Sequence, residues 1–196
     1  MSARLVRLGA LGMAAAALAF TANLEAQTAP AVSSMAPDFT SSGATRYGVL
    51  ATPVSLSDYR GKTVVLAFFP KARTRGCTIQ MESYRDRYDS LFNGGKDVVV
   101  MGISADPDSA LVNWAREADF PVLFVSDVEG KIGTLYGAWN AERKYDTRAL
   151  FIVAPDGRIT YTTPAFNVLS ADAYAELQSE VEKARGTSSA GAHSGH

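Results

Sequence analysis

Residues 63–69, Thr-Val-Val-Leu-Ala-Phe-Phe, form an unbroken run of β-branched and apolar side chains that leads directly into Pro70-Lys-Ala-Arg-Thr-Arg-Gly-Cys77. A continuous run without alternation is typical of a strand buried on both faces of a parallel sheet. We therefore expect this strand to be central. Pro70 ends it, and apolar residues at helical spacing run from Cys77 to Leu91, before the stop signal Gly94-Gly95. A strand, a loop and a helix would thus place Cys77 in the first turn of the helix.

Strand and helix patterns alternate along the rest of the chain, which indicates an α/β protein with parallel strands joined by helices. The last two strands are joined at Asp156-Gly157, a strong hairpin signal. The expected strands are 97–104, 122–125, 148–154 and 158–162, and the expected helices are 109–118, a short one after Asp127, and 170–185.

The 196 residues suffice for one domain, which we place at 35–185. Arg4 and Arg7 precede an apolar run from 8 to 20, so residues 1–26 resemble a secretory signal peptide. A membrane anchor is the alternative, but this run is shorter than the roughly 20 residues that a spanning helix needs. We expect an exported, periplasmic or extracellular protein without a stable membrane anchor. Small residues at 27–34 predict a mobile linker, and 186–196 a disordered tail.

Cys77 is the only cysteine, so the chain cannot form an internal disulfide. A lone cysteine is often a small buried apolar residue, and this is one interpretation. The alternative is a reactive thiol, because unpaired N–H groups in the first turn of a helix favour the thiolate. Arg73 and Arg75 would add positive potential if they point toward it. The formal net charge of −1 gives no reason to expect a nucleic-acid partner.

Other reactions of a cysteine need partners that are missing from the expected domain. The only histidines, His193 and His196, lie in the predicted tail, which argues against a cysteine hydrolase and a metal site. No glycine-rich phosphate motif follows a strand, so we expect no cofactor. Thr74 stands where a thioredoxin-type Cys-x-x-Cys pair would have its first cysteine. Among the reactions of a cysteine, this leaves thiol redox chemistry at a single cysteine.

The motif Pro70-x-x-x-Thr74-x-x-Cys77 resembles the peroxidatic signature of the peroxiredoxins, and the chain is similar to their bacterioferritin-comigratory, or Q-type, branch over residues 36–159. Flanking blocks agree in order and spacing. They are Ala36-Pro-Asp-Phe39, Val54-Ser-Leu-Ser-Asp-Tyr-Arg-Gly-Lys62, Gly102-Ile-Ser-Ala-Asp106 and Phe120-Pro-Val-Leu-Phe-Val-Ser-Asp127. The resemblance implies a thioredoxin-like fold, with a central mixed β-sheet flanked by helices.

The resemblance also implies a role for each matching residue. Cys77 would be the peroxidatic thiol and Arg148 the guanidinium that holds the thiolate and the developing charge on oxygen. Thr74 would orient the peroxide, and Pro70 would shield the site from water. Gly76 and Gln80 would border the substrate, with Gln80 bracing the arginine.

Two positions depart from the pattern of this branch. Glu82 stands where many members carry a resolving cysteine, and Arg75 stands where proline is usual. The resemblance therefore implies a one-cysteine thiol peroxidase acting on hydrogen peroxide and organic hydroperoxides, whose sulfenic acid is reduced by an external thiol, either a small thiol or a thioredoxin-like protein. A non-catalytic thioredoxin-like binding module and a peroxide sensor remain as alternatives. We expect a monomer or a homodimer.

Overall fold

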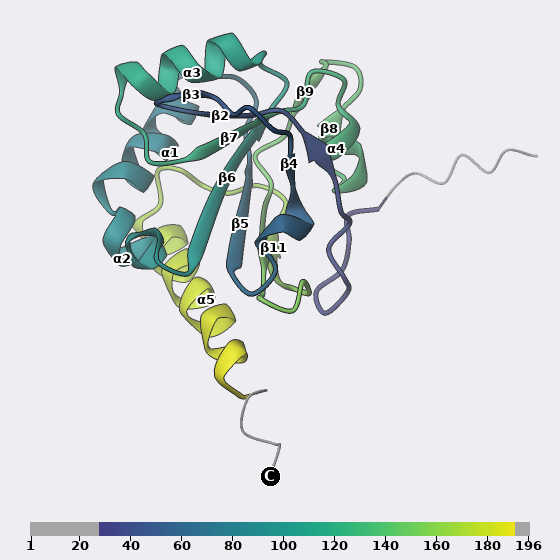
Figure 1. The fold of residues 1–196 in the computed structure, drawn as a ribbon, viewed down its shortest axis with the longest axis vertical. Helices are drawn as coiled ribbons and strands as arrows, with labels where there is room; N and C mark the ends of the chain where they lie inside the picture. Colours follow the sequence, from purple (N-terminus) through teal and green to yellow (C-terminus); the bar gives the residue numbers. More distant parts are fainter. Residues whose placement is uncertain (1–27, 191–196) are drawn as a thin grey trace, which may run out of the picture.

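A computed structural model describes residues 28–190, with side chains as far as residue 186, and a seven-stranded mixed sheet forms its centre (Figure 1). The strand order is β11-β10-β5-β6-β7-β2-β3. The strands are β2 (Gly43–Thr45), β3 (Gly48–Val49), β5 (Thr63–Phe68), β6 (Val98–Ser104), β7 (Leu123–Ser126), β10 (Leu150–Val153) and β11 (Ile159–Thr163).

The expected buried strand is β5, and all six of its residues are buried. It pairs in parallel with β6 and antiparallel with β10, so its prediction as an interior strand is confirmed. β6 also pairs in parallel with β7, and the hairpin predicted at Asp156-Gly157 joins β10 to β11. The mixed sheet flanked by helices is therefore the predicted fold class.

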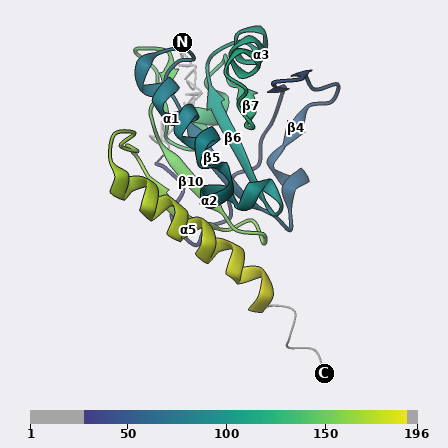
Figure 2. The same ribbon diagram turned by 90° about the vertical axis from the view of Figure 1, so that its left-hand side faces the viewer.

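Helices cover both faces of the sheet. α1 (Arg75–Asp86), α2 (Tyr88–Phe92), α3 (Asp108–Glu117) and α5 (Ala171–Ala190) contribute to one apolar cluster, which includes Cys77. Figure 2 shows α1, α2 and α5 lying together on this side of the sheet. α4 (Lys131–Leu135) packs with the second cluster, which contains Phe68, Tyr136 and Phe151. Cys77 thus belongs to a packed core and not to a surface loop.

The helix predicted from Cys77 to Leu91 starts earlier and is interrupted. α1 begins at Arg75, and Arg87 leaves the helical conformation with φ −119° and ψ 26°. The chain restarts as α2, and left-handed Asn93 ends it. The apolar spacing did not reveal the break because Leu91 and Phe92 are buried on the same side of the sheet as α1.

Both predicted domain boundaries need correction. Ser33 donates its backbone N–H to Ile159 O over 2.7 Å, and Ser34 O accepts from Ile159 N over 2.9 Å, so part of the predicted linker docks beside β11. At the other end, α5 continues past Arg185 to Ala190. Gly186 does not have the positive φ of the glycines that end helices, so it does not stop α5. The predicted signal peptide and residues 191–196 lie outside the described residues.

Three short strand pairs escaped the sequence analysis. β1 (Thr40–Ser41) pairs with β4 (Val54–Ser55) ahead of a 3-10 turn at Leu56–Tyr59, β2 with β3, and β8 (Trp139–Asn140) with β9 (Tyr145–Asp146). A second 3-10 turn, Asn93–Gly95, precedes β6. Strands of two or three residues are too short to show alternation. Between residues 28 and 190, no helix is both long and apolar enough to cross a membrane.

Candidate active site

Cys77 is the third residue of α1 and is fully buried. Thr74 occupies the N-cap, but its side chain does not cap the helix, and the first turn contains no acidic residue. The positive end of the helix therefore faces no competing side-chain anion from its own first turn.

Arg148 approaches the sulfur from the segment between β9 and β10. Its Nη2 donates to Cys77 Sγ over 3.5 Å, and its Nη1 donates to Gln80 Oε1 over 2.7 Å. The planar guanidinium thus contacts the thiol and a side chain one helical turn away at the same time. A cysteine that served only as apolar filling would not need a cationic donor. The structure therefore brings together three of the predicted site residues.

Gln80 is held in its orientation by a buried tyrosine. Its Nε2 donates to the hydroxyl of Tyr84 over 3.0 Å, which leaves Oε1 directed at Arg148. Burial raises the pKa of Tyr84 above its ordinary value, so the phenol stays neutral. Gln80 and Tyr84 are both fully buried, whereas Arg148 is half-buried, so the contact between Tyr84 and Gln80 is shielded from water.

Gly76 provides room for the guanidinium. A Cβ atom at this position would lie 3.0 Å from Arg148 Nη2 and 3.7 Å from its Cζ. Because the donor to Cys77 is that same Nη2, the missing side chain lets Arg148 lie across the first turn of α1. The resemblance placed Gly76 next to the substrate. In the structure, Gly76 lies next to the guanidinium of Arg148.

Thr74 and Pro70 lie in the loop that leads to Cys77. Thr74 is exposed, and its Oγ1 donates to the backbone oxygen of Lys71 over 2.9 Å, so toward a peroxide the hydroxyl can only accept a hydrogen bond. Pro70 borders a cavity of about 350 Å³. The other residues lining that cavity are Lys71, Ala105, Asp106, Pro107, Arg143, Lys144 and Tyr145. Cys77 does not line this cavity and is fully buried, so the sulfur is closed off in this conformation.

The two arginines near the cysteine in sequence do not contact the sulfur. Arg73, with a positive φ of 64°, forms a two-pronged ion pair with Glu117 of α3. The side chain of Arg75 is exposed and forms no hydrogen bond or ion pair within the described part of the chain. Positive potential at the thiol comes from Arg148 and the helix and not from the loop.

Comparisons with known proteins show which family this chain belongs to. Residues 32–162 match the AhpC/TSA family. The chain belongs to this family. It is 33% identical to the peroxiredoxin Bcp of Escherichia coli over 119 residues, covering 58% of this chain and 75% of that protein. It is 30% identical to the peroxiredoxin Bcp of Bacillus subtilis over 112 residues, covering 54% and 70%. The protein is thus a Bcp-type, or Q-type, peroxiredoxin and a thiol-dependent peroxidase.

Solved structures support the thioredoxin-like fold. The peroxidoxin BcpB of Mycobacterium tuberculosis superposes with a TM-score of 0.65 at 24% identity, covering 79% of this chain and 97% of that one. The Enterococcus faecalis AhpC superposes with a TM-score of 0.69 at 20% identity, covering 84% and 98%. At these identities the likeness concerns the fold.

Asp106 anchors the loop that leads to Cys77, and the sequence analysis did not single it out. Its Oδ2 accepts from the backbone N–H of Ala72 over 2.7 Å and from Ser104 Oγ over 3.0 Å, and the residue is buried. It therefore fastens the loop before Cys77 to the segment after β6. The only signal in the sequence was its place at the end of the block Gly102-Ile-Ser-Ala-Asp106.

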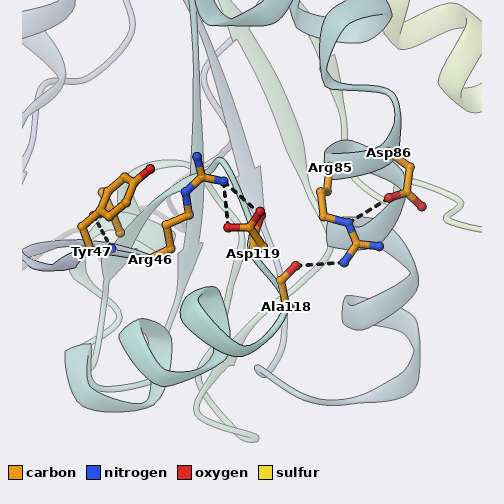
Figure 3. Close-up of polar contacts among 7 residues, drawn as sticks. Arg46, Tyr47, Arg85, Asp86, Ala118 and Asp119 are labelled. Carbon is orange, nitrogen blue, oxygen red and sulfur yellow. Dashed lines mark hydrogen bonds and ion pairs between the residues drawn. The ribbon is translucent and has the colours of Figure 1, made fainter.

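The far end of α1 is fastened as well. Arg85 of α1 donates through Nη1 to the backbone oxygen of Ala118 over 2.8 Å, just after α3 (Figure 3). In the same turn, Arg46 pairs with Asp119 over 3.0 Å. Figure 3 shows Arg46 and Arg85 approaching residues 118–119 from different elements. The helix that carries Cys77 is thus held to α3 near its end, while Asp106 and Glu117 hold the loop before it.

Proposed function

We propose that Cys77 is the peroxidatic nucleophile of a one-cysteine peroxidase and that Arg148 stabilises its thiolate. The observation that carries this proposal is the 3.5 Å contact between Arg148 Nη2 and the buried Cys77 Sγ. The thiolate attacks one oxygen of a hydroperoxide, the O–O bond breaks, and the other oxygen leaves as water or an alcohol after taking up a proton. Cys77 becomes a sulfenic acid. Arg148 supplies donors where negative charge moves from sulfur to oxygen.

Regeneration requires thiols from outside the chain, because the sequence holds no second cysteine. A first thiol attacks the sulfenic sulfur, releases water and leaves a mixed disulfide. A second thiol attacks that disulfide, restores Cys77 and departs as the oxidised reductant. Because Cys77 is fully buried in this conformation, residues that cover the sulfur must move before a bulky thiol can reach it.

Rapid mixing of the reduced protein with hydrogen peroxide and with an organic hydroperoxide tests the proposal. We expect Cys77 to react orders of magnitude faster than free cysteine, and Cys77→Ser to be inert. Arg148→Gln should slow the reaction by about 100-fold, the effect of removing one donor to a developing oxyanion. Arg158→Gln is the matched control, because Arg158 is an exposed arginine in the last hairpin. A wild-type rate no higher than that of free cysteine would contradict the proposal.

We also propose that residues 1–26 direct export of this enzyme. The supporting features are Arg4 and Arg7 ahead of the apolar run at 8–20. N-terminal sequencing of protein recovered from the periplasm or medium should begin at or near Gln27. An uncut chain in the cytoplasm would contradict this proposal. Light scattering after size-exclusion chromatography tests the prediction of a monomer or homodimer.

A further inference from the structure

The hairpin of β8 and β9 is connected to the active site through the chain. Asp146, the last residue of β9, lies two residues before Arg148. The hairpin lies against α4 and its N-cap, because a Cβ atom on Gly133 would lie 1.9 Å from Asp146 Oδ1 and one on Gly130 would lie 2.3 Å from the Trp139 ring. Anything that displaces this hairpin will therefore act on the backbone that presents Arg148.

Asp146 of this hairpin is a buried acid without hydrogen-bond partners. The residue is fully buried, and neither carboxylate oxygen has a hydrogen-bond partner among the described residues. An ionised carboxylate without donors is among the most unfavourable groups to bury, whereas a protonated one costs much less. The surroundings of Asp146 therefore favour the neutral acid.

A second buried carboxyl group, that of Asp127 after β7, faces the first. A Cβ atom on Gly133 of α4 would lie 1.9 Å from Asp146 Oδ1 and 3.3 Å from Asp127 Oδ2, so a single methyl group would contact both. Asp127 accepts the backbone N–H groups of Ile132 and Gly133 over 3.0 and 2.7 Å. Two adjacent buried carboxyl groups cannot both ionise at low cost, and only Asp127 has donors to support a charge.

Within the described structure no cation faces Asp146. On α4, Lys131 pairs with Glu129 and also attracts the charge of Asp127, and Lys131 and Glu129 are both exposed. On the hairpin itself, Glu142, Arg143 and Lys144 are exposed in the connecting turn. β6, which also contacts β9, has no titratable side chain. The charged group that faces Asp146 is therefore Asp127.

We propose that Asp146 is a positioning residue of the peroxidase: its carboxyl group stays protonated beside Asp127, keeps the β8–β9 hairpin docked, and thereby keeps Arg148 on Cys77. Ionisation of Asp146 would place a second negative charge in this interior and release the hairpin, so that Arg148 loses its contact with the sulfur. The inference rests on the proposed role of Arg148. Burial, and secondarily the charge of Asp127, raise the pKa of Asp146 to about 8, which puts the release in the mildly alkaline range.

The test is the rate of Cys77 oxidation by hydrogen peroxide between pH 6 and pH 10, for the wild type and Asp146→Asn. The wild-type rate should fall above about pH 8, approaching tenfold per pH unit as the neutral fraction declines. Asparagine keeps the shape and neutrality of the protonated acid, so Asp146→Asn should retain its rate up to pH 10. Glu142→Gln, an exposed acid in the same hairpin, should follow the wild type.

Asp127→Asn provides a second variant if Asp146→Asn does not fold. Removing the facing charge makes ionisation of Asp146 easier, so the fall in rate should begin at lower pH than in the wild type. A wild-type rate that does not fall above pH 8, or an equal fall in Asp146→Asn, would overturn the inference. A wild type that is unreactive at every pH would instead overturn the proposed role of Cys77.

Discussion

The backbone N–H of Ala72 donates to Oδ2 of Asp106 over 2.7 Å, and this bond ties the loop before Cys77 to the segment after β6. The same oxygen accepts from Ser104 Oγ, and only 9% of the surface of Asp106 is exposed. A buried acceptor therefore fixes the loop from outside the helix that carries the cysteine.

Asp106→Ala should lower both the stability and the peroxidase rate. The substitution leaves a backbone N–H and a hydroxyl group without their acceptor, which costs about 1–3 kcal/mol of unfolding free energy. The loop before Cys77 then loses its anchor, and the first turn of α1 loses its fixed position. Urea unfolding and rapid mixing with peroxide measure the two effects. Asp106→Asn, which retains one acceptor oxygen, should fall between the wild type and the alanine variant. An unchanged rate in Asp106→Ala would show that the loop does not depend on this bond.

Gly76→Ala should separate stability from activity. Alanine is the better helix former, so the melting temperature should stay the same or rise. The new Cβ atom would lie 3.0 Å from Arg148 Nη2 and push the guanidinium away from Cys77, and we expect the reaction with peroxide to slow by about tenfold or more. Gly186→Ala in α5 is the control, because a Cβ atom there meets open space. Equal rates in Gly76→Ala and the wild type would mean that Arg148 does not need this opening.

Substitution of Gln80 should slow the reaction with peroxide more than substitution of Tyr84. Gln80→Leu removes the acceptor that holds Arg148 Nη1, whereas Tyr84→Phe removes only the group that orients the Gln80 amide. We therefore expect the peroxide rate of Gln80→Leu to be lower than that of Tyr84→Phe, and both to be lower than that of the wild type. The three rates can be compared under the same mixing conditions. A Tyr84→Phe variant slower than Gln80→Leu would contradict the proposed chain of contacts.

The local part of the site could be predicted from the sequence because its signals are local. The apolar run at 63–69 and the proline that follows it place Cys77 at the start of a helix, and the structure has β5, the loop and α1 in that order. The contact between Cys77 and Arg148 spans 71 positions. No periodicity encodes such a contact, and only the resemblance to peroxiredoxins suggested that these residues work together.

Asp106 and Asp146 could not be recognised because an aspartate in a sequence does not reveal its burial. Asp106 becomes a loop anchor only when β5 and β6 pair, and Asp146 becomes a buried acid only when its hairpin docks on α4. The hairpin itself consists of two strands of two residues each, too short for an alternation pattern. The roles of Asp106 and Asp146 thus arise from tertiary contacts between segments that are distant in the sequence.

Asp146 also predicts how the stability of the fold responds to pH. Its pKa is about 8 in the folded protein against an ordinary value of 3.8, so unfolding releases a proton between these two pH values. The free energy of unfolding should therefore fall as the pH rises through this window, by at most about 1.4 kcal/mol per pH unit, and level off above it. Burial also raises the pKa of Asp127, which contributes with the same sign. The pKa values of Asp38 and Asp97 are lowered in the folded protein. Their contribution to the free energy of unfolding is lost only as the pH falls below the ordinary pKa of an aspartate.

Urea unfolding at pH 4.5, 6, 7.5 and 9 measures this slope. Asp146→Asn should be less sensitive to pH across the series, because its neutral amide has no proton to release, while the exposed control Glu142→Gln should keep the wild-type slope. A slope that is the same in Asp146→Asn and the wild type would mean that Asp146 is ionised in the folded protein at neutral pH. In that case a donor or a cation, and not a proton, would have to stabilise the buried carboxylate.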